Sequence, residues 1–292
     1  MTGAERRRLY ARRRLTGAAV LLVALVALVA TSMRGRPGVP PQEMQVQPAM
    51  PAAIAPEAPA MAASEAPMPQ ALDVWTIPGR YEGEVISQRV RFFPEKLLCL
   101  TFDDGPDATV TPQVLETLAE HDARATFFVL GRQARAYPDL LKAIIDGGHA
   151  IGHHSYSHAD RYSAAEAADE MERTCALIEE AGGHPPTLFR PPYGILDSPL
   201  TGLAREHGHA TIMWTISSAD SRRIGAEVIA HNVIYTPNPG DIVLMHDGPG
   251  HAATAAALPE ILSKLSASGF RFITLPELLQ AWDRWLAEQP VA

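Results

Sequence analysis

The stretch KLLCLTFDDGP, residues 96–106, is the most informative part of the 292-residue sequence. An apolar run that ends at Gly105 and Pro106 predicts a buried strand followed by a turn. Side chains alternate between the two faces of a strand, so the adjacent carboxylates of Asp103 and Asp104 can perform different tasks. Two neighbouring anions repel each other, and one stays protonated unless a cation or a metal lies between them. The stretch therefore predicts a functional site at the carboxyl end of this strand.

Apolar runs that resemble strands alternate with helical patterns along the rest of the sequence. The expected strands cover residues 97–102, 125–130, 149–152, 187–190, 210–216, 241–246 and 270–274. Helical patterns lie near residues 111–122, 134–147, 163–181, 198–208, 223–236, 253–268 and 275–287. This alternation is typical of α/β proteins with a parallel sheet covered by helices. We predict a distorted (β/α) barrel of about seven or eight strands, with a doubly wound sheet as the alternative.

Residues 1–34 predict an export signal that precedes the fold. Six arginines come before an apolar stretch from residue 18 to residue 30. Extended to residues 15–33, the stretch is long enough to form a transmembrane helix that acts as a signal anchor. The arginine-rich flank would stay in the cytoplasm, so the rest of the chain would be exported and tethered to the cell membrane. Cleavage of the signal would instead give a secreted protein.

Composition separates the remaining parts of the chain. Residues 35–71 are dominated by Pro and Ala and predict a disordered linker, and residues 72–95 form a transitional segment before the folded domain. Residues 1–36 hold eight Arg and one Glu, whereas the remaining residues hold 17 Lys and Arg against 32 Asp and Glu. We expect an exported domain this acidic not to bind nucleic acid.

Polar side chains gather at the carboxyl ends of the expected strands. They are Asp103, Asp104, His154, His158, Arg190, Tyr193, Asp220, His246 and Asp247. In an α/β barrel these strand ends meet on one face, where active sites are built. The chain has two cysteines, so a metal there must be bound by His and carboxylate side chains. The other histidines are interpreted as structural or solvated: His149, His153, His184, His207, His209, His231 and His251.

The order of these motifs resembles the polysaccharide deacetylase family, the carbohydrate esterases with a NodB-type domain. The resemblance covers about residues 95–285, and the catalytic domain is predicted to span residues 96–288. The matching motifs are TFDDG at 101–105, HSYSH at 154–158, RPPYG at 190–194 and LMH at 244–246. A further family motif, two Asp three apart followed by Trp, departs here. Asp220 is kept, but Ser217 replaces the first Asp and Ser221 replaces the Trp, which changes one wall of the substrate site.

The residue types indicate a metal-assisted hydrolysis. Asp104, His154 and His158 offer one oxygen and two nitrogen ligands, a donor set for catalytic Zn²⁺, with Co²⁺ or Ni²⁺ as alternatives. We expect Asp103 to act as general base and Arg190 to orient it and keep it ionised.

A second pair of residues is expected to supply the proton for the leaving group. We expect His246 to act as general acid and Asp220 to orient it and favour its charged form. The resemblance implies that the backbone N–H of Tyr193 stabilises the oxyanion, and it assigns Pro192 and Leu244 to the same substrate region.

The resemblance implies a metal-dependent hydrolase that removes acetyl groups from N-acetylated amino sugars of peptidoglycan, chitin-like chains or exopolysaccharides. An O-acetyl esterase acting on a polysaccharide such as xylan is an alternative, because an ester needs the same metal and base. Alternatives from other classes are a carbohydrate-binding protein with a weakened site and a membrane scaffold. The expected partners are an acetylated polysaccharide and the membrane, and a monomer is the default expectation.

Overall fold

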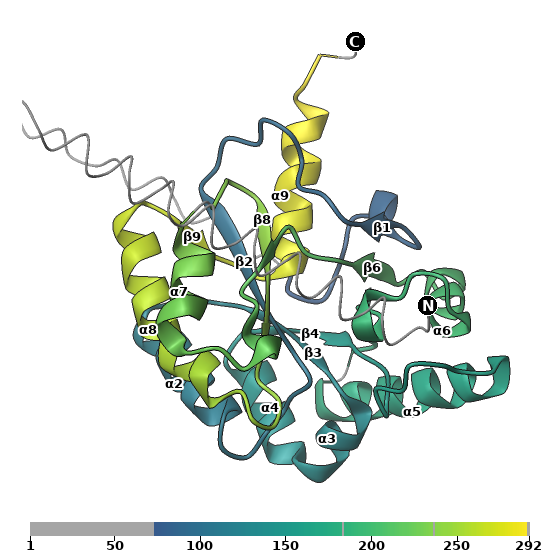
Figure 1. Cartoon of the computed structure of the whole chain (residues 1–292). Helices are drawn as coiled ribbons and strands as arrows, with labels where there is room; N and C mark the ends of the chain where they lie inside the picture. The colour runs from purple at the N-terminus through teal and green to yellow at the C-terminus, as the bar shows by residue number, and fades with distance from the viewer. Residues whose placement is uncertain (1–72, 183, 236, 291–292) are drawn as a thin grey trace, which may run out of the picture. The chain divides into compact units, whose positions relative to one another are not determined.

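The computed structural model describes residues 73–182, 184–235 and 237–290, so the predicted anchor and linker lie outside the described residues. Within these residues all strand pairings are parallel, and nine strands form one sheet (Figure 1). Its order is β1-β6-β5-β4-β3-β2-β8-β7, with β9 paired to β2. The strands are β1 (Val85–Ile86), β2 (Leu97–Asp103), β3 (Thr126–Val129), β4 (Ala150–His153), β5 (Leu188–Phe189), β6 (Ala210–Ile212), β7 (Ile216–Ser217), β8 (Asp241–His246) and β9 (Arg271–Phe272).

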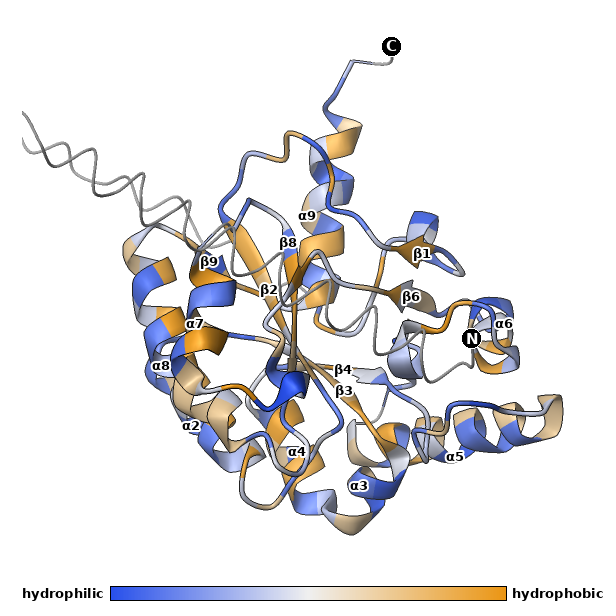
Figure 2. Cartoon of the chain, in the orientation of Figure 1, coloured by the Kyte–Doolittle hydropathy of each residue, from blue (hydrophilic) through white to orange (hydrophobic). Residues whose placement is uncertain are grey.

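Helices connect the strands, which confirms the predicted α/β class. They are α2 (Thr111–Glu120), α3 (Gly131–Ala136), α4 (Pro138–Asp146), α5 (Ala164–Gly182), α6 (Pro199–Glu206), α7 (Ala226–Ile234), α8 (Ala252–Ala267) and α9 (Leu275–Ala287), with the 3₁₀ turns η1 (Gly79–Tyr81), η2 (Pro192–Gly194) and η3 (Asp220–Arg222). In Figure 2 the central strands are mostly orange, whereas the helices carry both orange and blue residues. No helix among the described residues is both long and apolar enough to cross a bilayer.

Strand β2 is apolar along its length because both of its faces are buried. Leu98, Leu100 and Phe102 pack in a core cluster with residues of α2, α7 and α8. Leu97 and Cys99 pack in a second cluster, which contains buried leucines of α9 and Trp282. A parallel strand covered on both faces lacks the polar alternation of a half-exposed strand. By the same alternation, Thr101 and Asp103 lie on the face of Cys99, which becomes polar toward the carboxyl end.

The sheet curls into a half-barrel, and this curl brings the strand ends together. Strands β6 and β7 lie toward opposite ends of the strand order, yet residues 213–215 alone connect them. A connection this short spans at most about 14 Å, so the two ends of the sheet must approach each other. Among the described residues β1 and β7 are not paired, so the barrel is not closed.

Two predicted elements are each divided in the structure. The strand predicted over residues 210–216 is divided into β6 and the start of β7. The Arg190 side chain donates hydrogen bonds to the carbonyl oxygens of Ile212 and Met213, so these oxygens are not used in strand pairing. The helix expected over residues 134–147 is divided into α3 and α4 at Tyr137. Pro138 starts α4, and a proline disfavours helical backbone at the residue before it.

Candidate active site

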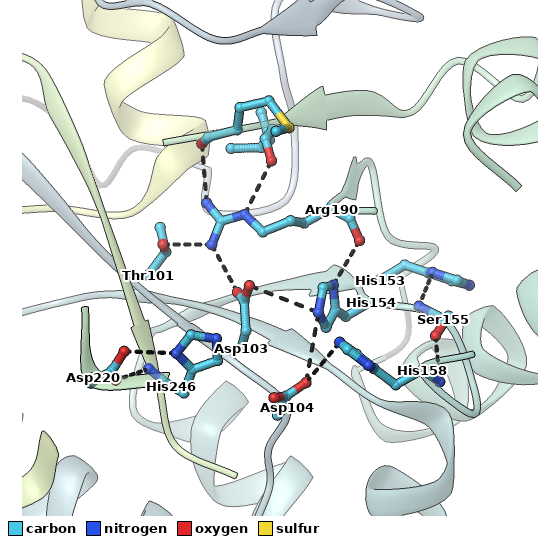
Figure 3. A network of polar contacts seen from close by, with 12 residues as sticks. Thr101, Asp103, Asp104, His153, His154, Ser155, His158, Arg190, Asp220 and His246 are labelled. Carbon is cyan, nitrogen blue, oxygen red and sulfur yellow. Dashed lines mark hydrogen bonds and ion pairs between the residues drawn. The ribbon is translucent and has the colours of Figure 1, made fainter. Parts of the chain in front are cut away.

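The predicted site residues converge at the carboxyl ends of β2, β4, β5, β7 and β8 (Figure 3). Asp103 ends β2 and lies opposite His246, which ends β8, in the parallel register. The loops that leave these strands turn sharply, and the backbone has φ of 73° at Asp104, 60° at His158 and 56° at Tyr193. Left-handed backbone at residues other than glycine costs free energy and is concentrated at functional sites.

Asp104, His154 and His158 form one compact group of potential ligands, called here the Asp104 cluster. Asp104 Oδ1 lies 3.7 Å from His154 Nε2 and 3.5 Å from His158 Nε2. One ligand atom from each residue lies within 4.8 Å of the others. These separations suit three ligands that share one ion.

The surroundings of the Asp104 cluster also fit a metal ion. Asp104 Oδ1 is buried and accepts no hydrogen bond within the described part of the chain, so it lacks the partner that a buried carboxylate oxygen requires. His154 Nδ1 lies 2.7 Å from the backbone oxygen of Arg190, and donation of an Nδ1 proton there leaves Nε2 to bind a metal. Burial lowers the pKa of His154 to about 3, so the imidazole is neutral, as a ligand must be.

Asp103 belongs to a separate ion pair with Arg190. Arg190 is fully buried, and its Nη1 donates to Asp103 Oδ1 at 2.8 Å and to Thr101 Oγ1 at 2.7 Å. Burial raises the pKa of Asp103 above the ordinary carboxyl range, although the positive charge of Arg190 opposes the shift. Asp103 Oδ2 lies 3.8 Å from His154 Nε2 and thus faces the Asp104 cluster. The carboxylate is therefore held in place and is more basic than an exposed aspartate.

His246 is paired with Asp220 on the other side of Asp103. His246 Nδ1 lies 2.8 Å from Asp220 Oδ1, and the other ring nitrogen points toward Asp103 (Figure 3). Asp220 is itself fixed, because its Oδ2 accepts hydrogen bonds from Thr254 Oγ1 and from the His246 backbone, both at 2.8 Å. Burial alone would lower the pKa of His246, but the hydrogen bond with Asp220 and the nearby charge of Asp103 raise it to about 9.

The residues assigned to the substrate region lie beside these pairs. The Tyr193 side chain is 65% exposed and its ring packs edge-on against His158, with the centroids 4.5 Å apart. Pro192 is buried before it in η2, and Leu244 lies in β8 two residues before His246, on the same face. In the motif that differs from the family pattern, Ser217 and Ser221 are both exposed. Their side chains are small, so neither position carries a large side chain beside the site.

Three further residues lie beside the site and were given no role in it from the sequence. Glu170 in α5 accepts hydrogen bonds from the backbone N–H groups of Tyr156 and Ser157, at 2.6 and 2.8 Å, which fixes the loop that carries the ligands. Asp247 is buried, and burial raises its pKa to about 7. The His251 ring stacks on His246 with centroids 4.9 Å apart, although His251 was interpreted as structural or solvated.

Two of these three residues carried some signal in the sequence. Asp247 directly follows His246, and His251 lies within a short glycine-rich loop behind it. Glu170 lies within a helix, and no motif marks it.

The fold brings a buried carboxylate, an imidazole paired with a second carboxylate and a set of potential metal ligands together at one end of a parallel sheet, an arrangement that fits a hydrolase. A family model described as polysaccharide deacetylase matches residues 91–212. The chain belongs to the polysaccharide deacetylase family and is a hydrolase of this kind.

Known relatives and a solved structure extend the match over the catalytic domain. Two peptidoglycan-N-acetylglucosamine deacetylases of Bacillus cereus are 36% and 38% identical over 188 and 192 residues. These alignments cover 63% and 64% of this chain and 68% and 89% of the relatives. The crystal structure of the Bc1960 peptidoglycan N-acetylglucosamine deacetylase bound to an N-hydroxybenzamide has a TM-score of 0.63 at 33% identity. The structural match covers 69% of this chain and 94% of the Bc1960 chain.

Proposed function

We propose that the chain is a metal-dependent deacetylase that hydrolyses the N-acetyl group of N-acetylglucosamine in peptidoglycan. The observation that carries this proposal is the arrangement of the Asp104 cluster, the Asp103–Arg190 pair and the His246–Asp220 pair around one set of strand ends. The substrate is proposed from the similarity to the two Bacillus cereus enzymes, which are peptidoglycan-N-acetylglucosamine deacetylases.

The Asp104 cluster would hold the metal ion. A divalent ion bound there would polarise the amide carbonyl and lower the pKa of a water molecule. Zn²⁺ suits the set of one carboxylate and two imidazoles best, and Co²⁺ or Ni²⁺ can use the same donors. The backbone oxygen of Arg190 orients His154, so the arginine serves both the base and a ligand.

Asp103 would take the proton from the attacking water. Its carboxylate faces His154 without belonging to the Asp104 cluster, and its rotation is restricted by the hydrogen bond from Arg190, which also donates to Thr101. A buried carboxylate with a raised pKa accepts a proton more readily than an exposed one, which suits a general base.

His246 would give a proton to the departing amine. An amine is a poor leaving group unless it is protonated, so the acid must carry its proton at the pH of catalysis. The pKa of about 9 keeps His246 charged at neutral pH. We assign stabilisation of the oxyanion to the backbone N–H of Tyr193, with Leu244 and Pro192 shaping the acetyl site.

Replacement of Asp220 by asparagine should shift the pH profile of catalysis. The acid is active while protonated, so activity falls as pH rises through the pKa of His246. Asp220→Asn removes a negative charge and weakens the hydrogen bond that raises this pKa, so the alkaline limb should move to lower pH. The measurement is kcat/KM against pH, with the exposed Asp139→Asn as the matched control. An unchanged alkaline limb would show that Asp220 does not raise the pKa of the general acid.

The proposed substrate can be tested by acetate release from three polymers. The full chain should release acetate from peptidoglycan and leave free amines on the glucosamine units. Chitooligosaccharides and acetyl-xylan serve as comparisons for neutral amide and ester substrates. Preferred release from acetyl-xylan without new amines would contradict the proposed amide hydrolysis and favour an O-acetyl esterase.

We also propose that the enzyme acts outside the cytoplasm, anchored by residues 15–33. The arginine-rich flank and the apolar stretch support this location, as does a substrate that lies in the cell envelope. Protease added to cells with a permeabilised outer layer should digest the catalytic domain. Full protection of the domain while an internal cytoplasmic marker also stays protected would contradict export.

A further inference from the structure

A second set of potential metal ligands lies beside the first. Asp220, His246 and His251 each offer one ligand atom, and these atoms lie within 4.8 Å of one another. The set contains one carboxylate and two imidazoles, the same donors as the Asp104 cluster. The three residues come from η3, from the end of β8 and from the position just before α8.

Both rings bring an Nδ1 atom toward Asp220, and because they stack nearly parallel, the His251 ring must rotate for both nitrogens to face one ion. His246 and His251 stack at an interplanar angle of 21°, and the Nδ1 atoms of both rings approach Asp220. His246 Nδ1 lies 2.8 Å from Asp220 Oδ1, whereas His251 Nδ1 lies 3.8 Å from Asp220 Oδ2, which is too far for a hydrogen bond. The His251 side chain is 15% exposed, so solvent reaches this edge of the set.

The Oδ2 atom of Asp220 is already held by two hydrogen bonds. It accepts them from Thr254 Oγ1 and from the His246 backbone, and neither bond involves the ring of His246 or His251. Outer contacts of this kind orient a carboxylate ligand and are typical of metal sites. In the Asp104 cluster, by contrast, Asp104 Oδ1 accepts no hydrogen bond from the described residues. An ion would therefore find the carboxylate oxygen free in the Asp104 cluster, whereas the carboxylate of the second set is already hydrogen-bonded.

We propose that Asp220, His246 and His251 form a second site for Zn²⁺, and that its occupation inhibits the enzyme. Zinc would bind His246 Nδ1, His251 Nδ1 and one oxygen of Asp220. The proton shared between His246 Nδ1 and Asp220 Oδ1 would leave to solvent as the metal bonds form. Because the ion must displace this proton, the second site should bind zinc more weakly than the Asp104 cluster does.

Inhibition follows from the chemistry of the imidazole, and this step rests on the proposed role of His246 as general acid. An imidazole that binds zinc through Nδ1 keeps a proton on Nε2. Release of that proton to the amine would leave an imidazolate, which makes the metal-bound ring a far weaker acid than an imidazolium. Zinc at the second site would therefore stop protonation of the leaving group without touching the Asp104 cluster.

Binding stoichiometry tests the site without relying on activity. The metal-free full chain is dialysed against increasing Zn²⁺, and bound zinc is measured by elemental analysis. The unmodified chain should bind two equivalents, and His251→Phe should bind one, because phenylalanine keeps the stacked ring but removes the ligand. His251→Gln provides a second variant in case phenylalanine disturbs folding, and the exposed His231→Gln is the matched control, which should still bind two.

Activity then tests inhibition. Zinc beyond one equivalent should lower the activity of the unmodified chain and of His231→Gln below its value at one equivalent, whereas each His251 variant, measured against its own activity at one equivalent, should show no further loss. One equivalent bound by the unmodified chain would overturn the second site, even if hydrolysis and the proposed function stand. Two equivalents bound by both His251 variants would place the extra ion elsewhere and would overturn it as well.

Discussion

Removal of divalent metal from the full chain should abolish amide hydrolysis, and one equivalent of Zn²⁺ or Co²⁺ should restore it. The expectation rests on Asp104 Oδ1, which is buried without a hydrogen bond in the described residues and lies within 3.7 Å of two imidazole nitrogens. A water molecule at neutral pH is a poor nucleophile without a metal to acidify it. The measurement is acetate release from peptidoglycan against metal content, after chelation and after stepwise addition of metal.

A ligand variant should reproduce the effect of chelation. His154→Ala removes a nitrogen donor whose ring is fixed by the backbone of Arg190, so metal affinity and activity should fall together. His207→Ala, at an exposed histidine, is the matched control and should retain both. Full hydrolysis by the metal-free chain would show that the Asp104 cluster has another purpose.

The sequence predicted the central strands well because their apolar runs are buried on both faces. The expected strand over residues 241–246 coincides with β8, and the strand expected to end at residue 102 continues by one residue to Asp103. Such runs have no competing amphipathic pattern, so their period and length identify them. The convergence of the site residues followed from the same reasoning, because the carboxyl ends of parallel strands share one edge of a sheet.

The features that the sequence did not predict depend on contacts between distant residues. The division of the expected strand over residues 210–216 arises because the side chain of Arg190 binds the carbonyl oxygens of Ile212 and Met213. The strand propensity of residues 210–216 cannot reveal a contact with an arginine that lies elsewhere in the sequence. By contrast, the break at Tyr137 has a local cause in the sequence, because Pro138 disfavours helical backbone at the residue before it.

The supporting residues of the site show the same limit. Glu170 binds the ligand loop from within α5, and His251 reaches His246 because the chain folds back after β8. Neither residue lies at the end of an expected strand, where active-site residues of this fold are concentrated. A site residue that acts by supporting another residue is thus invisible until the fold places the two together.

Asp103→Asn should lower turnover by roughly 10²–10⁴ while the chain still binds its metal, because asparagine keeps the size of the side chain but cannot accept the proton. Arg190 would keep its hydrogen bonds to Thr101 and to two backbone oxygens, so its position should persist. The measurements are kcat on peptidoglycan, bound zinc and the thermal unfolding temperature. The last of these shows whether the buried pair is also needed for stability.

The neighbouring substitution Asp104→Asn is the matched comparison, since it changes the same chemical group one residue away. Asp104 carries the oxygen that faces His154 and His158, whereas Asp103 is bound by Arg190. Asp104→Asn should therefore lose bound metal and activity together, and added zinc should restore part of both. Asp103→Asn should not respond to added zinc, because its defect lies in proton transfer. If the metal were lost from Asp103→Asn and kept by Asp104→Asn, the roles of ligand and base would have to be exchanged between the two residues.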